Sequence, residues 1–381
     1  MARDGQWTVL QSCSSAAWGG LEMQALQECI ELRKESLNVL LICHPQSRLE
    51  NEARLRNIPT LPITLRDFPD PIGIAKLRRA ITGREVDIAH SQISKDLWTL
   101  APAVRLAPKP IPLLLTKRIG SFILKKDPLH RWVYGQLDQV LAISEVIRKN
   151  LIETCPLPST KVEVLHDGVD LDLFSPTRVN TRRIRKEFNV GHKRFLIGMV
   201  GRFSPGKGHE DFLGALKILR EKHPQVMALI AGEASHGEHE YEERIRSLAS
   251  QMGLDDIVVF TGFRKDIPDI MASLDLFVFP SHAEAFGDVV IEAMAMQKPI
   301  VSTNCDGVTD IVVDGETGIQ VPPRDPNALA RAIALLVKDN RRREKYGKAG
   351  LKRIKTHFNL KLRTSYLIKT YERLLKEKLK G

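Results

Sequence analysis

The sequence predicts an α/β protein built from two doubly wound domains, each a parallel β-sheet covered by helices on both faces. Three observations lead to this fold class. The chain has 381 residues, which is longer than a usual single domain. Its hydrophobic fraction of 43% and charged fraction of 27% are ordinary for a globular protein with sizeable cores. In both halves, short runs that are apolar throughout alternate with helical patterns, as in strands buried on both faces of a parallel sheet.

The first domain is expected to span residues 1–178. Its apolar runs predict strands at residues 8–13, 38–44, 86–90, 111–116 and 139–144, and the stretch 162–170 closes the domain. The first strand leads through a small-residue loop into an amphipathic helix over residues 21–34. That loop contains Gly19 and Gly20 but lacks the Gly-x-Gly-x-x-Gly spacing of a dinucleotide-binding fold, so a nicotinamide cofactor is not supported.

The second domain is expected to span residues 179–359, after an irregular link. Its strands are predicted at residues 195–200, 226–231, 257–261, 276–279 and 300–303, each followed by a helical pattern. The basic segment from Pro326 onward is too long for one helix, and we expect breaks near Asn340 and Phe358. The last helix, residues 360–381, is expected to rejoin the first domain.

Cysteine usage and charge narrow the classes of function. The five cysteines are scattered, odd in number and never spaced Cys-x-x-Cys, which favours neither a disulfide framework nor a zinc site. The N-terminus lacks the apolar core of a signal peptide, so a cytoplasmic location is expected. A formal charge of +11 predicts attraction to polyanions, which leaves nucleotide phosphates, anionic lipid and nucleic acid open.

The stretch 281–295 carries the first candidate site. An apolar strand runs into a tight loop and then a helix, which Asp288 is expected to cap. The backbone N–H groups near residues 286–288 have no intrahelical partners, and such a helix start attracts an anion. Glu284 and Glu292 frame this join with seven residues between them. Their carboxylates are suited to accept hydrogen bonds from sugar hydroxyls, although the same pair also fits a solvated helix residue and a polar loop residue.

The loop 201–208 carries the second candidate site. It follows a predicted strand, contains glycines that allow close backbone approach, and supplies Arg202 and Lys207, whose positive charges suit a diphosphate. It lacks the residue order of a P-loop. Together with the stretch 281–295, this loop predicts a diphosphate site at the carboxyl edge of one sheet.

These motifs together resemble glycosyltransferase family 4, the retaining nucleotide-sugar enzymes of GT-B fold, over nearly the whole chain. The carriers of the resemblance are the segments 19–22, 166–170, 201–208, 261–264 and 314–318, with Glu233 and the Glu284-x7-Glu292 pattern. The resemblance implies two doubly wound domains that face each other across a cleft. The sequence departs from the family at His166-Asp167 and at Thr116-Lys-Arg118, where many relatives carry a histidine-bearing acceptor loop, so the acceptor stays open.

The resemblance also implies roles for individual residues. Arg202 and Lys207 would hold the donor diphosphate and stabilise the charge that grows on the leaving group. Glu292 would bind the ribose hydroxyls, and Glu284 would orient the transferred sugar. The remaining contacts implied are the amides of Ala285, Phe286 and Gly287 at the sugar phosphate, the backbone of Phe263 and Arg264 at the base, Gly19 and Gly20 over the diphosphate, and His90 near the anomeric carbon. With these roles, Glu284, His90, Arg202 and Lys207 form the expected catalytic set.

The function expected from this resemblance is transfer of a hexose from a nucleoside-diphosphate sugar to a glycan or glycolipid hydroxyl, with retention and without a metal or other cofactor. The family suggests lipopolysaccharide, capsule or exopolysaccharide assembly in a bacterium. The basic segment 117–131 is expected to rest on an anionic membrane surface, at the inner face. The alternatives are a GT-B epimerase or phosphorylase, and a basic nucleic-acid-binding protein, which no recognisable module supports.

Overall fold

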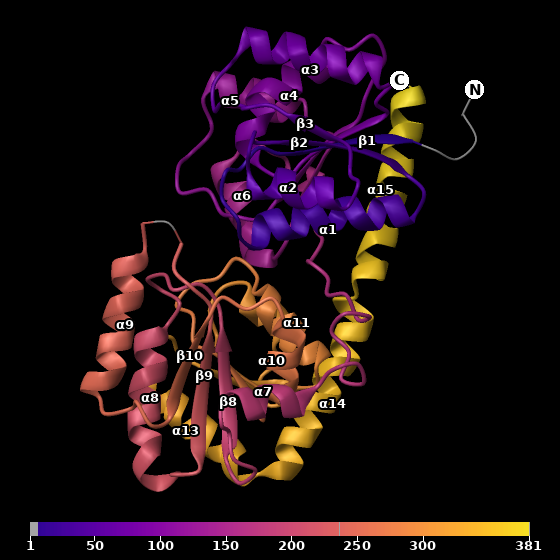
Figure 1. Cartoon of the computed structure of the whole chain (residues 1–381). Coiled ribbons are helices and arrows are strands. Elements are labelled where there is room, and N and C mark those ends of the chain that lie inside the picture. Colours follow the sequence, from indigo (N-terminus) through magenta and orange to yellow (C-terminus); the bar gives the residue numbers. More distant parts are fainter. Residues whose placement is uncertain (1–6, 236, 381) are drawn as a thin grey trace. The chain divides into compact units, whose positions relative to one another are not determined.

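The structure is a computed structural model of the chain that describes residues 7–235 and 237–380. Residues 1–6, the start of the N-terminus for which no signal peptide was predicted, therefore lie outside the described part. The chain forms two compact units, Met1–Asp167 with Lys361–Gly381, and Gly168–Leu360 (Figure 1). Each unit has one parallel sheet, and helices follow its strands. The predicted α/β fold class is confirmed.

The first unit contains a sheet of seven strands in the order β3-β2-β1-β4-β5-β6-β7. All six strand pairs are parallel. The strands are β1 (Thr8–Cys13), β2 (Asn38–Cys43), β3 (Thr60–Pro62), β4 (Ile88–Ser91), β5 (Leu113–Lys117), β6 (Gln139–Ala142) and β7 (Val162–Val164). The sequence did not predict β3, which is three residues long and ends in a proline that only an edge strand tolerates.

The helices of the first unit follow the strands in sequence. They are α1 (Gly20–Lys34), α2 (Arg48–Leu55), α3 (Pro71–Gly83), α4 (Leu97–Arg105), α5 (Pro128–Gly135) and α6 (Glu145–Thr154), with short 3-10 turns at Ser94–Asp96 and Ser159–Lys161. Side chains of Ser47, Asp70, Asp127 and Ser144 accept hydrogen bonds from the first turns of α2, α3, α5 and α6. These caps explain where four of the helices begin.

The C-terminal helix α15 (Leu360–Lys380) completes the first unit, although it is the last element of the chain. Leu367, Tyr371 and Leu374 are buried in the same hydrophobic cluster as residues of α1, β1 and β2. An apolar face that continues over two turns of helix accounts for this packing, because residues at this spacing lie on one side of a helix.

The second unit contains a sheet of six parallel strands in the order β10-β9-β8-β11-β12-β13. The strands are β8 (Phe195–Val200), β9 (Val226–Ala231), β10 (Val258–Gly262), β11 (Leu276–Phe279), β12 (Ile300–Thr303) and β13 (Gly318–Val321). The helices are α7 (Thr181–Glu187), α8 (His209–Lys222), α9 (His239–Gln251), α10 (Ile267–Ser273), α11 (Asp288–Ala295), α12 (Val308–Ile311), α13 (Pro326–Lys338) and α14 (Asn340–His357). The helix breaks expected near Asn340 and Phe358 are confirmed.

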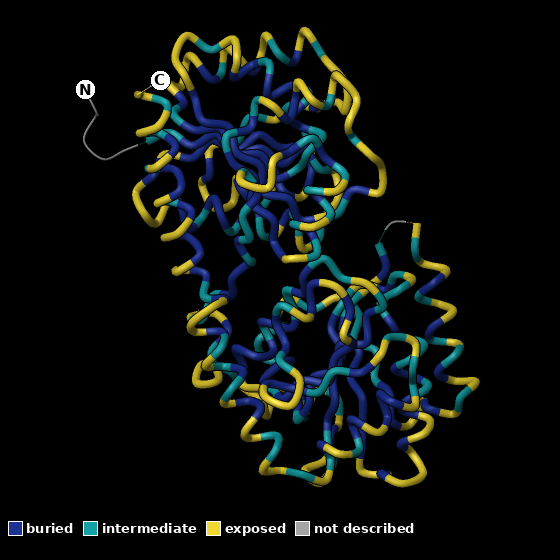
Figure 2. The backbone as a smooth tube through the Cα atoms, turned by 180° about the vertical axis from the view of Figure 1, so that it is seen from behind, coloured by how far each residue is buried: buried dark blue, intermediate teal, exposed yellow. Residues whose placement is uncertain are grey.

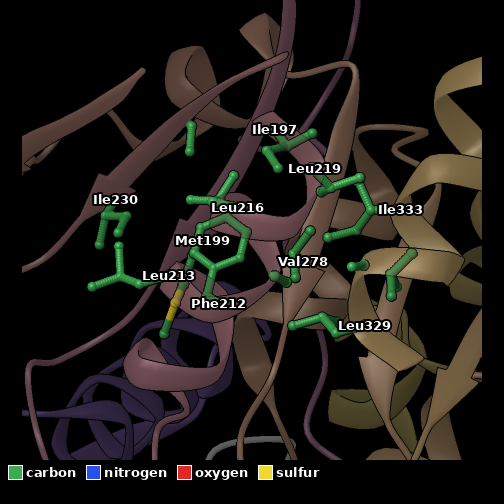
Figure 3. Close-up of a cluster of buried hydrophobic side chains, with 14 of the residues drawn as sticks. Ile197, Met199, Phe212, Leu213, Leu216, Leu219, Ile230, Val278, Leu329 and Ile333 are labelled. Carbon is green, nitrogen blue, oxygen red and sulfur yellow. The ribbon is translucent and has the colours of Figure 1, made fainter. Parts of the chain in front are cut away.

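The core of the second unit joins the central strands to two helices. Figure 3 shows Ile197 and Met199 of β8 and Val278 of β11 among side chains of α8 and α13. The central strands β1, β2, β4, β5 and β6 of the first unit and β8, β9, β11 and β12 of the second are buried along most of their length (Figure 2). Each large apolar side chain removed from water contributes about 1.5–3 kcal/mol. The sheet is therefore a rigid base for the loops at its edges.

The chain passes from the first unit to the second at residues 167–168 and returns to the first at residues 360–361, and these two crossings are neighbours. The amide of Val169 donates to the carbonyl of Phe358 at 2.9 Å, and the amide of Leu360 donates to the carbonyl of Val169 at 3.1 Å. A Cβ on Gly168 would lie 2.7 Å from the Cα of Leu360, so glycine permits this approach. Because of these bonds, residues 168–178 belong to the second unit, whereas the sequence placed them in the first.

None of the helices formed by the described residues is long and apolar enough to cross a membrane.

Candidate active site

The candidate site lies in the second unit, at the carboxyl ends of β8 and β11. These strands are neighbours in the sheet, and the strand order reverses between them. Ligands of open α/β sheets bind at such a reversal, because the loops from the two strands turn away to opposite faces of the sheet. The two loops that the sequence singled out, 201–208 and 281–287, leave the sheet at this point.

Backbone contacts hold the two loops together. The amide of His282 donates to the carbonyl of Gly206 at 2.8 Å. At Gly208, φ is +78° and a Cβ would lie 2.0 Å from the carbonyl oxygen of Pro280, so this position requires glycine. The His282 Nε2 also lies 2.6 Å from a carboxylate oxygen of Asp211 of α8, within hydrogen-bond distance. The loops therefore form one unit, and the spacing of their side chains is fixed.

Lys207 and Glu284 meet across this junction. The Lys207 Nζ lies 2.5 Å from the Glu284 Oε2, and the two side chains are 25% and 20% exposed. The backbone of Glu284 is held as well, because its amide donates to Asp306 at 3.2 Å and its carbonyl accepts from Gly307 at 3.0 Å. A cation and a carboxylate are thus presented to solvent at one fixed place.

The start of α11 differs from the prediction. Asp288 does not cap the helix; it is the first helical residue, and Gly287 occupies the N-cap position with φ at +117°. Glycine is favoured at that backbone angle, and it brings no side-chain cap. Phe286 is 2% exposed and its ring packs against Phe358, so only its backbone can face a ligand.

Glu292 lies on the second turn of α11 and is half-buried. Burial, together with the negative charge of Asp288, raises the pKa of Glu292 to about 8. A carboxyl group in this state is largely protonated at neutral pH, so it both donates and accepts hydrogen bonds. Its chemistry therefore suits a diol such as ribose.

Arg202 and the segment after β10 complete the predicted residues of the second unit. Arg202 is exposed, and one guanidinium nitrogen donates to the Ser235 hydroxyl at 3.2 Å. Arg264 forms ion pairs with Asp266 at 2.7 Å and Glu187 at 2.5 Å, and these hydrogen bonds raise the pKa of Arg264. The Arg264 side chain is committed to these pairs, which leaves its backbone for a base. The ring of Phe263 is 44% exposed.

The predicted residues of the first unit are described separately. Gly19 is the N-cap of α1 in an extended conformation, and a Cβ there would meet only the Glu22 side chain at 3.7 Å. Gly20 is the first residue of that helix. Nothing within the unit demands glycine at position 19, so its predicted closure over a diphosphate stays a prediction.

The sequence predicts that a strand ends at His90, and in the structure His90 is the last residue but one of β4. Its side chain is fully buried. Its Nδ1 is 2.6 Å from the Tyr371 hydroxyl of α15, and its Nε2 is 2.8 Å from the Thr116 hydroxyl. The C-terminal helix covers the ring, which the sequence could not indicate. Contact between His90 and a sugar would require this cover to open, and it stays a prediction.

A buried charge network surrounds His90, and the sequence did not reveal it. Its members are Glu28, Arg118, Asp167 and Arg363, whose side chains are at most 4% exposed. Arg363 pairs with Glu28 at 2.8 Å, and Arg118 pairs with Asp167. Burial alone would raise the pKa of Glu28, but Arg363, His90 and Arg118 outweigh it and hold the pKa low. One signal was available, because Glu28 interrupts the apolar face of α1.

The network also corrects the predicted basic surface. Arg118 was counted among its charges but is buried in the ion pairs just described. Lys117 is buried too, and its Nζ donates to the Ser94 hydroxyl at 2.8 Å. Burial, with help from the charge of Lys125, lowers the pKa of Lys117 to about 8. These two residues therefore cannot rest on a membrane.

Comparison with known families matches most of the chain. Residues 180–353 match the family described as "Glycosyl transferases group 1". Residues 18–173 match "Glycosyltransferase Family 4". The two matched regions cover the candidate active site, the whole sheet of the second unit and all strands of the first sheet except β1.

Among curated relatives, the chain is 30% identical over 240 residues to the capsular polysaccharide biosynthesis glycosyltransferase CapM of Staphylococcus aureus, covering 62% of each protein. It is 30% identical over 245 residues to the lipopolysaccharide core biosynthesis mannosyltransferase LpcC of Rhizobium leguminosarum bv. viciae, covering 64% of this chain and 67% of that protein. The matched stretch thus spans about two thirds of the length of these relatives.

Solved structures resemble the chain over nearly its whole length. A glycosyltransferase from Rickettsia africae superposes with a TM-score of 0.88 at 22% identity, covering 97% of this chain and 99% of that one. Anabaena HepE in complex with UDP and glucose superposes with a TM-score of 0.81 at 24% identity, covering 96% and 99%. At such identities the likeness establishes the fold, which is the GT-B fold expected from the sequence.

Proposed function

Since the chain belongs to glycosyltransferase family 4, we propose that it transfers a hexose from a nucleoside-diphosphate sugar to a hydroxyl of a glycan or glycolipid, with retention at the anomeric carbon. The observation that carries this proposal is the meeting of Lys207 and Glu284 at the carboxyl edge of β8 and β11. The names of the curated relatives favour a role in capsular or lipopolysaccharide assembly.

Lys207 and Arg202 are the groups that bind the diphosphate. Both follow β8 in the same loop, and the start of α11 lies across the junction from them. Cationic side chains and helix-end amides stabilise a diphosphate that gains negative charge as the glycosidic bond breaks. They supply the positive charge that a divalent metal would otherwise bring, so the proposed reaction proceeds without one.

Glu284 changes partner when the donor binds. Its carboxylate pairs with Lys207 in the free protein. The donor phosphate takes over Lys207, and sugar hydroxyls then donate to the released carboxylate. Because the two charged side chains are partly exposed, their pairing is weak and is readily exchanged for these stronger bonds. The pair thus occupies both charged groups until the donor arrives.

Retention follows in this proposal from attack on the face that the diphosphate leaves. The departing phosphate oxygen accepts the proton of the attacking hydroxyl, so no protein carboxylate needs to act as nucleophile. Glu292, with its pKa raised to about 8, is poorly suited to that role and binds the ribose instead. A cytoplasmic location is also proposed, and the five cysteines, all buried and unpaired, agree with a reducing compartment.

Nucleotide-dependent thermal stabilisation tests the proposal. Purified protein is heated with a panel of nucleoside diphosphates and their sugars, and a ligand at 100 times its dissociation constant should add about 2.7 kcal/mol. Lys207→Ala and Glu292→Ala should abolish the shift, whereas Lys217→Ala, an exposed change on α8, should keep it. No shift with any nucleotide would overturn the proposal, and a donor recovered with an isomerised sugar would indicate an epimerase.

A further inference from the structure

Exposed apolar side chains gather between β5 and the end of α5. The described part of the chain has 18 exposed large hydrophobic residues, and six of them fall within residues 119–132. They are Ile119, Phe122, Ile123, Leu124, Leu129 and Trp132, with exposed fractions of 55%, 97%, 63%, 72%, 64% and 48%. Single exposed apolar residues are normal on a surface, but six within a stretch of 14 residues indicate a site of interaction.

The loop that carries this set is held in place on both sides of its tip. The amide of Ser121 donates to the Asn150 side chain at 2.6 Å, and Asn150 donates back to the Ser121 carbonyl at 3.0 Å. After the tip, the amide of Lys125 donates to the carbonyl of Thr154 at 2.7 Å. Asn150 and Thr154 both belong to α6. The tip, residues 122–124, therefore projects from two fixed points on one helix.

Helix α5 adds two more exposed apolar residues to this segment. Leu129 and Trp132 are three residues apart and so lie on one face of the helix, while Val133 and Tyr134 are buried on another. Tryptophan is enriched where a membrane meets water, because its ring is apolar and its N–H still finds a polar partner. The tip and this face together are called the apolar ridge.

Within residues 119–132, which carry the apolar ridge, the charged side chains are mostly basic. Lys125, Lys126 and Arg131 lie within this stretch, and Lys126 and Arg131 are exposed. Asp127 is the one acidic residue in the stretch 119–132, and it caps α5 and pairs with His130 at 2.5 Å. Basic side chains beside an apolar wedge match a leaflet rich in anionic lipid.

We propose that the apolar ridge docks on an anionic membrane surface, with Phe122, Ile123 and Leu124 inserted among the lipid chains and Lys125, Lys126 and Arg131 against the headgroups. A second copy of the chain fits the ridge less well, because a symmetric contact would bring the same basic residues together. The docking does not depend on the donor site, since the ridge belongs to the first unit.

Vesicle flotation tests this docking. Wild-type protein should float with vesicles of phosphatidylcholine and phosphatidylglycerol, and should float much less with phosphatidylcholine alone or at high ionic strength. The triple change Phe122→Ser, Ile123→Ser and Leu124→Ser should lower the partition coefficient by about tenfold or more. Lys125→Gln with Lys126→Gln should remove most of the dependence on phosphatidylglycerol. Leu55→Ser, a change at a residue 77% exposed on α2, is the matched control and should float as wild type does.

A spectroscopic readout reports the depth of the tip. Phe122→Trp should show a blue-shifted emission on anionic vesicles, and brominated lipid chains should quench it. Flotation of the triple serine variant at the wild-type level would overturn the proposal. Self-association that the triple variant abolishes, measured by light scattering without vesicles, would assign the ridge to a second copy and overturn it too.

Measuring nucleotide-dependent stabilisation on the same samples separates this inference from the proposed function. The triple variant should keep the nucleotide shift, which also establishes that it is folded. Wild-type protein that floats but shows no nucleotide shift would reject the transferase proposal alone. Protein that shows the shift but does not float would reject the docking alone.

Discussion

The molecule contains two pairs of oppositely charged side chains, one in each unit, that differ chiefly in how exposed they are to solvent. Lys207 and Glu284 in the second unit are 25% and 20% exposed and sit on glycine-containing loops. Glu28 and Arg363 in the first unit are 2% and 4% exposed and sit on helices. A ligand can take over the partners of the first pair but cannot reach the second. Accessibility, rather than the number of charges, separates a binding site from a structural network.

Removing one member of the buried network should give the largest loss of stability. In Arg363→Met, the carboxylate of Glu28 loses its nearest arginine partner, which costs about 3–5 kcal/mol of unfolding free energy. Urea unfolding measures the loss, and Lys369→Met, an exposed change on the same helix, should cost well under about 1 kcal/mol. Equal stability of the two variants would mean that the network does not hold α15 in place.

Removing one member of the accessible pair should act on the reaction and spare the fold. Lys207→Ala should slow sugar transfer by about 10²–10³-fold, because a cation aimed at the leaving group is lost. Its free energy of unfolding in urea should stay within about 1 kcal/mol of the wild-type value, since a partly exposed pair contributes little. If Lys207→Ala unfolded at a much lower urea concentration than wild type yet transferred sugar at the wild-type rate, the accessible pair would be structural and not part of the active site.

Tyr371→Phe tests whether His90 belongs to the structural network or to the active site. The change removes the hydroxyl 2.6 Å from the His90 Nδ1 and should cost about 1–3 kcal/mol, because a buried polar atom loses a partner. Tyr366→Phe, at an exposed tyrosine that bonds to Glu163, is the control. If His90 is structural, kcat of the folded variant is unchanged, and a fall in kcat without a change in KM would place His90 at the sugar.

The smallest expected effect is the pH dependence that Glu292 contributes. Its pKa is raised to about 8 in the folded protein, so the folded state binds this proton more tightly than the unfolded state does. The stability from this group is complete below the unfolded pKa and is lost as pH rises through about 8. Between about pH 6 and pH 9, the wild-type protein should lose about 1 kcal/mol of unfolding free energy through Glu292, a value kept small because this residue is partly exposed. In Glu292→Gln this loss should be absent. Identical urea midpoints in the two proteins at both pH values would contradict the raised pKa.

Features encoded in short stretches were predicted from the sequence. The strands β8 and β11 are continuous apolar runs, and the loops after them carry Arg202, Lys207 and Glu284 in local patterns. β13 was missed because Gly318 and a glutamine interrupt its four residues. The prediction that Asp288 caps α11 was wrong. The N-cap residue has a positive φ, which glycine adopts readily, and Gly287 occupies that position.

Features that depend on distant partners were not predicted. His90 and Tyr371 are 281 residues apart, and no local pattern pairs them. The sequence predicts Arg118, beside Lys117, as a surface charge, because its partner Asp167 lies 49 residues further along the chain. Whether a charge is buried depends on what covers it, and the cover here is the last helix of the chain.

The place of α15 also bears on the order in which the protein can fold during synthesis. The second unit is one continuous stretch, so it can close on itself as soon as its own residues have emerged from the ribosome. The first unit is made earlier but waits for Arg363 and Tyr371 before Glu28 and His90 have their partners. The half of the protein that is translated first is therefore the half that matures last.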